Sequence, residues 1–254
     1  MQIYALCLAL ANAELLFRIG MMSHIKQIHY NKKLVEININ SEADESVFSE
    51  IFTEHEYKIL EEVIVCAKSP IIDIGAHVGM FSIFCAVLNP TMQVFAYEPD
   101  EDNFAAMKEN LKLNNVRNVS MKNVAVGAKM GERILYISKD SHNHSLLGAE
   151  AAGDFSGAEK NVQAVTLERI LQQNRLASVS LVKMDCEGAE FEILENLSAE
   201  AFAVVENFYV ECHRYSYDMN PVKLRDIFKK NGFKVETWSN HYDKRMGFIW
   251  ARRS

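Results

Sequence analysis

A short apolar run at residues 71–74, which leads into a glycine turn, constrains the fold more than any other feature. Three of its four residues are isoleucine, which is typical of a central strand in a parallel sheet. Gly75 and Gly79 bracket the segment GAHVG that follows, and an apolar helix is predicted at Phe81–Leu88. A strand that passes through such a turn into a helix indicates an α/β domain.

The same alternation of strand and helix continues to the end of the chain. It predicts a parallel sheet with helices on both faces, in which ligands bind at the carboxyl ends of the strands. The predicted strands are Gln93–Tyr97, Val119–Val126, Arg133–Ser138, Ser180–Met184, Phe208–Cys212, Phe233–Trp238 and Gly247–Ala251. The predicted helices are Glu101–Asn114, the end of a strand-to-helix step at Val162–Gln173, a segment ending near Asn196, and Pro221–Asn231.

The N-terminal residues 1–68 are predicted to form a helical unit that packs on a core domain of residues 69–254. Residues 24–39 alternate in polarity and predict a short hairpin that turns near Asn31. The apolar spacing in residues 41–67 then predicts one helix.

The first 17 residues are apolar, but Asn12 and Glu14 interrupt them and they are too short to cross a bilayer comfortably. No Lys or Arg precedes them, which disfavours a signal peptide. We expect a helix that packs on the fold or on a partner. Contact with a membrane surface and a cleaved signal remain the alternatives.

Charge and cysteine usage restrict the function further. The 254 residues carry a net charge of -7, which argues against a nucleic-acid-binding surface because phosphate binding depends on Lys and Arg. The five cysteines are dispersed without a CxxC pair. They predict reduced thiols and a cytoplasmic location.

The first two strand ends carry the residues expected to bind a cofactor. Asp73 ends the first strand, and the GxxxG spacing of Gly75 and Gly79 differs from the GxGxxG of dinucleotide sites. Glu98 ends the second strand, where an acid commonly accepts hydrogen bonds from ribose hydroxyls. The alternatives are a purely structural glycine pair and a helix-capping role for Glu98, although Asp100 is the better N-cap candidate.

The third strand ends in NVAVG. Asn123 and the backbone of Val124 and Ala125 are candidates to contact an adenine edge, although Asn123 is equally suited to a turn. In SHNHS, His142 and His144 have a spacing compatible with metal ligation, but no third ligand is near in sequence. We therefore expect a polar loop there and assign no metal ligand from this motif.

Two later strands deliver charged residues to the same edge of the sheet. Lys183, Asp185 and Glu187 lie at one strand end, and Glu211 and His213 lie at the next. Adjacent strands are only about 4.8 Å apart, so these side chains can line one pocket. Lys183 is also suited to a plain ion pair and His213 to an ordinary strand end. Glu190, in the helix that follows the first of these strand ends, is expected to be a first-turn acid stabilised by the helix dipole.

The motifs DIGAHVG, YEPD, NVAVG, VTLERIL, LVKMDCEGAE and YVECH, in this order, resemble the FkbM-type methyltransferases. The resemblance runs from about Ser46 to the C-terminus, and KMDCEGAE matches the family's K-x-D-x-E-G-x-E signature most specifically. It implies an α/β Rossmann-like class I methyltransferase fold, with a seven-stranded sheet whose last strand is antiparallel. It also implies S-adenosylmethionine as cofactor and O-methylation of sugars or secondary metabolites.

The resemblance assigns residues to two groups. His77 stands where many members of the family have Asn. Asp185 is expected to belong to both groups. The cofactor-binding residues are expected to be Asp73, Gly75, His77, Gly79, Glu98, Asn123, Ala125 and Asp185. The reaction site is expected to contain Lys183, Asp185, Glu187, Glu211 and His213.

The predicted reaction is in-line transfer of a methyl group from a sulfonium to a hydroxyl of a small-molecule or glycan acceptor. Such a hydroxyl needs a base or a metal. His213 is the candidate base, while Asp185 and Glu211 either orient it or hold an ion such as Mg²⁺. Residues 138–160 and the N-terminal segment are expected to form pocket walls, with Ser141–Glu159 as a lid.

Three rival functions remain. A methyltransferase acting on RNA or protein is disfavoured by the acidic charge and by the lack of an NPPY-like motif. A nicotinamide-dependent oxidoreductase would need the three-glycine loop. A non-catalytic cofactor-binding protein is disfavoured because Gly75, Gly79, Glu98 and Asp185 are all present.

Overall fold

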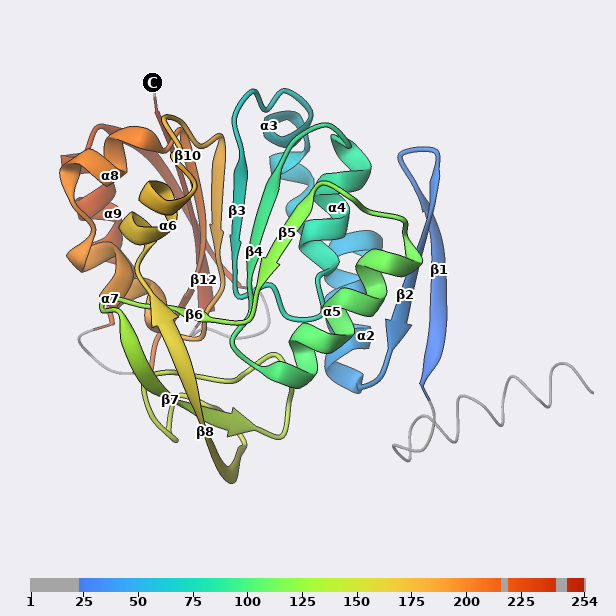
Figure 1. Cartoon of the computed structure of the whole chain (residues 1–254). Coiled ribbons are helices and arrows are strands. Elements are labelled where there is room, and N and C mark those ends of the chain that lie inside the picture. Colours follow the sequence, from blue (N-terminus) through green and yellow to red (C-terminus); the bar gives the residue numbers. More distant parts are fainter. Residues whose placement is uncertain (1–22, 216–218, 241–245, 254) are drawn as a thin grey trace, which may run out of the picture.

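The computed structural model describes residues 23–215, 219–240 and 246–253. Its centre is a seven-stranded sheet (Figure 1). In spatial order the strands are β11 (Phe233–Ser239), β12 (Met246–Arg253), β10 (Asn207–His213), β9 (Leu181–Met184), β3 (Ile71–Ile74), β4 (Val94–Tyr97) and β5 (Val119–Lys122). The pairs from β10 to β5 are parallel, whereas β12 is antiparallel to both β10 and β11. The mostly parallel sheet with an antiparallel last strand is therefore confirmed.

Helices cover both faces of this sheet, and each face has its own apolar core. Phe84 and Met107 are fully buried on one side, while Phe202 and Phe228 are buried on the other. Burying each such side chain contributes about 1.5–3 kcal/mol. On the first side lie α4 (Met80–Leu88) and α5 (Glu101–Leu113), and on the second lie α6 (Leu167–Gln173), α7 (Ala189–Asn196), α8 (Ala199–Val204) and α9 (Pro221–Lys230) (Figure 1).

The predicted single helix over residues 41–67 is wrong. The structure has α2 (Glu42–Phe48), a π-helical turn, a 3-10 turn and α3 (Glu61–Val65). His55 has a left-handed backbone with φ 57°, which a continuous helix cannot accommodate. Phe48 nevertheless packs into the same apolar core as α4, so this unit is attached to the sheet.

The N-terminal hairpin is confirmed, with β1 (His24–Tyr30) antiparallel to β2 (Lys33–Ile39) and the turn at Asn31. Asn110 of α5 and Asn114, the C-cap of this helix, accept hydrogen bonds from the backbone of β2, each at 2.9 Å. These bonds fasten β2, the inner strand of the hairpin, to the helix layer (Figure 1).

A second small sheet lies beyond the carboxyl ends of the central strands (Figure 1). It consists of β6 (Ala125–Val126), β7 (Gly131–Ser138) and β8 (Phe155–Val165). The predicted single strand Val119–Val126 is therefore wrong, because its two halves pair in different sheets. The irregular stretch expected after Ser138 is also shorter than predicted, since β8 begins at Phe155.

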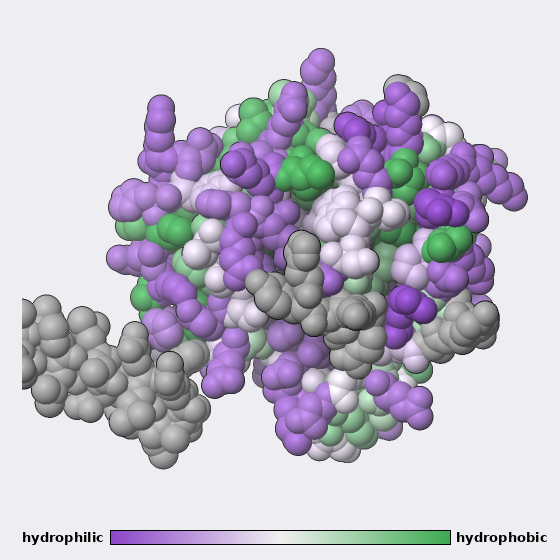
Figure 2. Space-filling view, turned by 180° about the vertical axis from the view of Figure 1, so that it is seen from behind, coloured by the Kyte–Doolittle hydropathy of each residue, from purple (hydrophilic) through white to green (hydrophobic). Residues whose placement is uncertain are grey.

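The surface carries polar and charged residues over most of the face in Figure 2, with apolar residues scattered among them. Within the described part of the chain, no helix has the length and apolar character needed to cross a membrane. The helix predicted for the first 17 residues lies outside the described residues.

Candidate functional site

A cavity of about 660 Å³ opens at the carboxyl ends of the central strands. Gly75 and Glu98 line it on the β3–β4 side, and Asp185 and Glu211 line it on the β9–β10 side. The segment after β7 and the helical turns of residues 46–57 close it from two further directions. The strand ends predicted to hold the site therefore do meet in one pocket.

The two glycines of the first turn have different structural roles. Gly75 lines the cavity with φ 75°, and a Cβ there would lie 1.7 Å from the carbonyl oxygen of Asp185. Only glycine permits this close approach of two strand-end loops. Gly79 does not line the cavity, and a Cβ there would meet Met107 at 2.6 Å. Gly79 lets α4 pack against α5, and its contact with a cofactor stays a prediction.

Glu98 is 5% exposed and lines the cavity, with both carboxylate oxygens hydrogen-bonded to the backbone. Oε2 accepts from the amide of His77 at 2.8 Å, and Oε1 accepts from the amide of Asp100 at 2.9 Å. Asp100, as expected, caps α5, which leaves Glu98 available to a ligand. Burial raises the pKa of Glu98 to about 7.

His77 lines the cavity, but its ring contacts protein groups. Nε2 lies 3.0 Å from Oγ of Ser141 and 3.5 Å from a carboxylate oxygen of Asp44. Burial, with a contribution from the charge of His142, lowers the pKa of His77 to about 3, so the ring is neutral. The residue thus links the glycine turn to α2 and to the segment after β7.

Asn123 and Ala125 separate in the structure. The amide of Asn123 donates to the carbonyl oxygens of Glu98 and Pro99, both at 3.0 Å, and the residue is not among those lining the cavity. The side chain thus holds the chain just after β4, which is the turn role that was the alternative, and the adenine contact stays a prediction. Ala125 is buried and lines the cavity as expected.

Lys183 connects the two sides of the site. Its Nζ donates to the carbonyl oxygen of Gly75 at 3.0 Å and to Asp185 at 3.3 Å, and it lies 3.6 Å from Asp73. Burial opposes its charge, but Asp185 and Asp73 outweigh this and hold the pKa of Lys183 above its ordinary value. Of the two roles considered from the sequence, a plain ion pair and a pocket residue at the reaction site, the structure shows the ion pair.

Asp73 is fully buried and does not line the cavity. Its Oδ2 accepts a hydrogen bond from Ser82 at 2.7 Å, and its Oδ1 faces Lys183. Its carboxylate therefore contacts protein groups behind the strand ends, and a cofactor contact stays a prediction.

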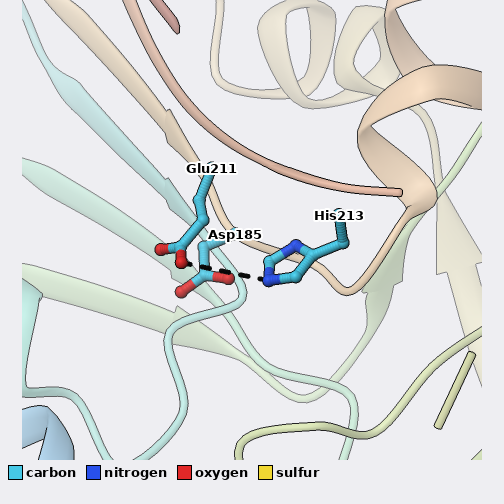
Figure 3. A group of neighbouring side chains, drawn as sticks. All are labelled: Asp185, Glu211 and His213. Atoms are coloured by element: carbon cyan, nitrogen blue, oxygen red, sulfur yellow. Dashed lines mark ion pairs between the residues drawn. The ribbon is translucent and has the colours of Figure 1, made fainter. Parts of the chain in front are cut away.

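Asp185, Glu211 and His213 form a cluster, the edge group, at the ends of β9 and β10 (Figure 3). One ligand-type atom from each lies within 4.8 Å of the others. Glu211 and His213 share a face of β10 because side chains two apart on a strand point the same way. The predicted convergence of these three residues is borne out by their positions.

Charges around the edge group shift its pKa values. Burial favours neutral imidazole, but Glu187, Glu190 and Glu211 outweigh it and raise the pKa of His213 well above its ordinary value. Burial also acts on Asp185, yet Lys183 outweighs it and lowers the pKa of that carboxyl. The edge group is therefore a strongly coupled set of charges.

Two acidic residues that follow β9, Glu187 and Glu190, lie beside the ring of His213. Glu187 has φ 50°, accepts a hydrogen bond from the Tyr215 hydroxyl, and places Oε1 3.5 Å from Nε2 of His213. Glu190 accepts from the amide of Cys186 at 2.7 Å and lies 3.6 Å from Nδ1 of His213. Glu190 lies in the first turn of α7 as expected, but it also reaches the site.

One wall of the cavity comes from the N-terminal segment, as expected, but sequence reasoning did not identify its residues. Glu50, Glu54 and Tyr57 line it from the helical turns before β3. The i, i+4 spacing of the two acids was the available signal, but nothing in the sequence indicated which part of the domain they would face. Ser141, in the predicted lid, accepts a hydrogen bond from Asn103 at 2.8 Å through its carbonyl oxygen.

The chain matches the family model described as Methyltransferase FkbM domain over residues 73–235. The chain belongs to this family. It is 28% identical over 216 residues to methyltransferase sdnD of Sordaria araneosa, covering 74% of this chain and 82% of that protein. It is 23% identical over 224 residues to the 31-O-demethyl-FK506 methyltransferase FkbM of Streptomyces tacrolimicus, covering 78% and 85%. The resemblance to FkbM-type methyltransferases is thus confirmed.

A crystal structure of methyltransferase FkbM from Methylobacillus flagellatus KT is similar with a TM-score of 0.49 and 13% identity, covering 72% of this chain and 43% of that chain. The FkbM methyltransferase match begins at Asp73 and includes both sides of the cavity at the strand ends. The wall formed by residues 46–57 precedes the matched range.

Proposed function

We propose that this chain is an S-adenosylmethionine-dependent O-methyltransferase that acts on a hydroxyl of a sugar or secondary metabolite. The observation that carries the proposal is the setting of Glu98. Two backbone amides fix its carboxylate inside the cavity, and each oxygen keeps a lone pair for a further hydrogen bond. That arrangement suits the two hydroxyls of a ribose.

The surrounding residues fit the rest of such a cofactor. Gly75 exposes backbone beside Asp185, and Ala125 offers a small apolar surface for a base. Glu98 and Asp185, the acids that line this part of the cavity, suit a cationic sulfonium and amine better than a diphosphate. This disfavours the nicotinamide alternative.

The acceptor is proposed to bind beside the edge group. When bound, S-adenosylmethionine supplies an electrophilic methyl group, which leaves the sulfur as the C–S bond breaks and the C–O bond forms. The protein must hold the acceptor hydroxyl in line and take up its proton. Asp185, Glu211 and His213 are the residues placed to do so, and Glu187 supports them.

The acceptor class follows from charge and from one relative. Glu50, Glu54, Glu150 and Asp154 line the outer cavity, which disfavours phosphorylated or nucleic-acid acceptors. The Streptomyces tacrolimicus relative is named for 31-O-demethyl-FK506, which supports a metabolite hydroxyl as acceptor.

A methyl-release assay against a panel of glycans and hydroxylated metabolites tests the proposal. We expect turnover with a neutral hydroxylated acceptor, and we expect His213→Ala to lower that turnover by about 10²–10⁴-fold while cofactor affinity stays nearly unchanged. Methyl transfer to RNA or protein alone would contradict the proposed acceptor class.

A further inference from the structure

We propose that the edge group is a binding site for a divalent first-row transition ion, with Mn²⁺ preferred over Mg²⁺. The inference rests on the proposed function in one respect, since the ion would lie where the acceptor hydroxyl binds. It sharpens the alternative that Asp185 and Glu211 hold a metal by adding His213 as a ligand.

The first argument is geometric. The candidate ligand atoms of Asp185, Glu211 and His213 all lie within 4.8 Å of one another. Two atoms that each lie about 2.2 Å from one ion are at most about 4.4 Å apart. Shifts of a few tenths of an ångström would bring all three residues onto one ion. Figure 3 shows the two carboxylates and the ring directed toward a common point.

The second argument is the state of His213, which is 5% exposed. Nδ1 has no hydrogen-bond partner. Nε2 lies 3.5 Å from Glu187 and 3.9 Å from Glu211, farther than the roughly 2.7–3.2 Å of an N–H···O bond. A buried imidazole that is aimed at two carboxylates without bonding to either leaves room for a ligand between them.

The third argument concerns the outer contacts of the ring. Metal-binding histidines usually direct their other nitrogen to a carboxylate, which fixes the ring and its tautomer. Glu190 lies 3.6 Å from Nδ1 of His213, and its second oxygen has no partner. Glu190 is itself held by the amide of Cys186. Glu190 is therefore the carboxylate that faces Nδ1, at a distance of 3.6 Å from which a small shift of the ring would form the hydrogen bond.

The charges on this side also favour a cation. Asp185, Glu187 and Glu211 bring three acidic side chains to the edge, and Lys183 beside them is shared between Asp185 at 3.3 Å and Asp73 at 3.6 Å. A divalent ion would balance most of this excess.

The mixture of ligands selects the kind of ion. Mg²⁺ prefers six oxygen ligands in a strict octahedron, while an imidazole nitrogen suits first-row transition ions. Two carboxylates and one imidazole therefore favour Mn²⁺ or a similar ion. Such an ion would act as a Lewis acid that lowers the pKa of an acceptor hydroxyl, and the proton would then pass to Glu187, the neighbouring carboxylate that is not a ligand, in place of His213.

The test is a Mn²⁺ titration of the full chain followed by electron paramagnetic resonance, with Mg²⁺ as competitor. We expect one saturable Mn²⁺ site per chain, and at least about tenfold weaker binding in Asp185→Asn and in His213→Ala. His213→Ala should also lose the preference for Mn²⁺ over Mg²⁺. The matched control is Asp154→Asn, which removes a carboxylate elsewhere in the same cavity and should leave Mn²⁺ binding unchanged.

Absence of saturable Mn²⁺ binding to the wild-type chain would overturn the metal site, whether or not the variants fold. Equal loss in Asp154→Asn and Asp185→Asn would overturn it too, because general negative charge would then explain binding. Calorimetry with S-adenosylmethionine on the same samples separates the two proposals. Cofactor binding without Mn²⁺ binding removes only the metal site, and Mn²⁺ binding without cofactor binding removes the proposed function.

Discussion

At the end of β4, both oxygens of Glu98 are bonded to backbone amides, whereas at the end of β10, Nδ1 of His213 has no hydrogen-bond partner. The protein alone thus fixes the carboxylate of Glu98 on the β3–β4 side of the cavity. On the β9–β10 side, the ring nitrogens of His213 lie 3.5–3.9 Å from the carboxylates around them, beyond hydrogen-bond distance. The difference indicates that the β3–β4 side is preorganised for the cofactor. The β9–β10 side is expected to complete its contacts only when an acceptor or an ion binds.

Lys183 is the residue that belongs to both sides, and its loss should have the largest effect on stability. Lys183→Met leaves Asp73 and Asp185 without their shared cation, so we expect the free energy of unfolding to fall by about 3–5 kcal/mol. Denaturant unfolding at neutral pH measures this. Lys139→Met, which breaks an exposed pair with Asp154, should cost under about 1 kcal/mol. Equal losses of unfolding free energy in the two variants would mean that the buried ion pairs of Lys183 stabilise the protein no more than the exposed pair of Lys139.

The contact between the two sides can be tested at Gly75. Gly75→Ala adds a left-handed backbone penalty and forces a methyl group against the carbonyl of Asp185, so we expect a loss of roughly 3 kcal/mol. Gly157→Ala has a similar φ of 86° but open space around it, and should lose only about 1–2 kcal/mol. Thermal unfolding compares them, and similar losses would show that the two loops can separate freely.

Removal of the Glu98 carboxylate should weaken cofactor binding, the function proposed for the β3–β4 side. Glu98→Ala leaves the ribose hydroxyls unpaired, which should weaken S-adenosylmethionine binding by about 1–3 kcal/mol. Asp102→Ala, on the exposed side of α5, should leave affinity unchanged. Calorimetry measures both, and wild-type affinity in Glu98→Ala would remove that residue from the cofactor site.

A smaller effect follows from the raised pKa of Glu98, which is about 7. Hydroxyl donors bind the carboxylate form, so cofactor affinity should fall as the pH drops through 7, by at most about tenfold per pH unit. Asp100 is the charged neighbour that contributes to this pKa. Glu98→Gln cannot titrate, so the difference between wild type and this variant isolates the effect. Parallel pH curves would contradict it.

The smallest expected effect is in the segment after β7. Residues 141–154 line the cavity at several points and lie between β7 and β8, so we expect their amide exchange to slow when cofactor and acceptor bind. Amides of β7 serve as the internal reference. Exchange that is unchanged by ligands would contradict the predicted lid.

The sequence was informative wherever a strand led into a turn. The apolar run before Asp73 and the two charged strand ends predicted the sheet edge, since parallel strands bring their carboxyl ends together. The break at His55 was not predictable, because a left-handed backbone at a non-glycine residue has no clear sequence signal. The protein contacts of Asp73 and Asn123 were not predictable, because position at a strand end does not reveal which way a side chain turns.

The most direct test of the central claim is calorimetric titration of the full chain with S-adenosylmethionine and, separately, with NAD. The geometry of Glu98 and the glycine turn predicts saturable one-site binding of S-adenosylmethionine and no measurable binding of NAD. Tight binding of NAD together with no binding of S-adenosylmethionine would contradict the account.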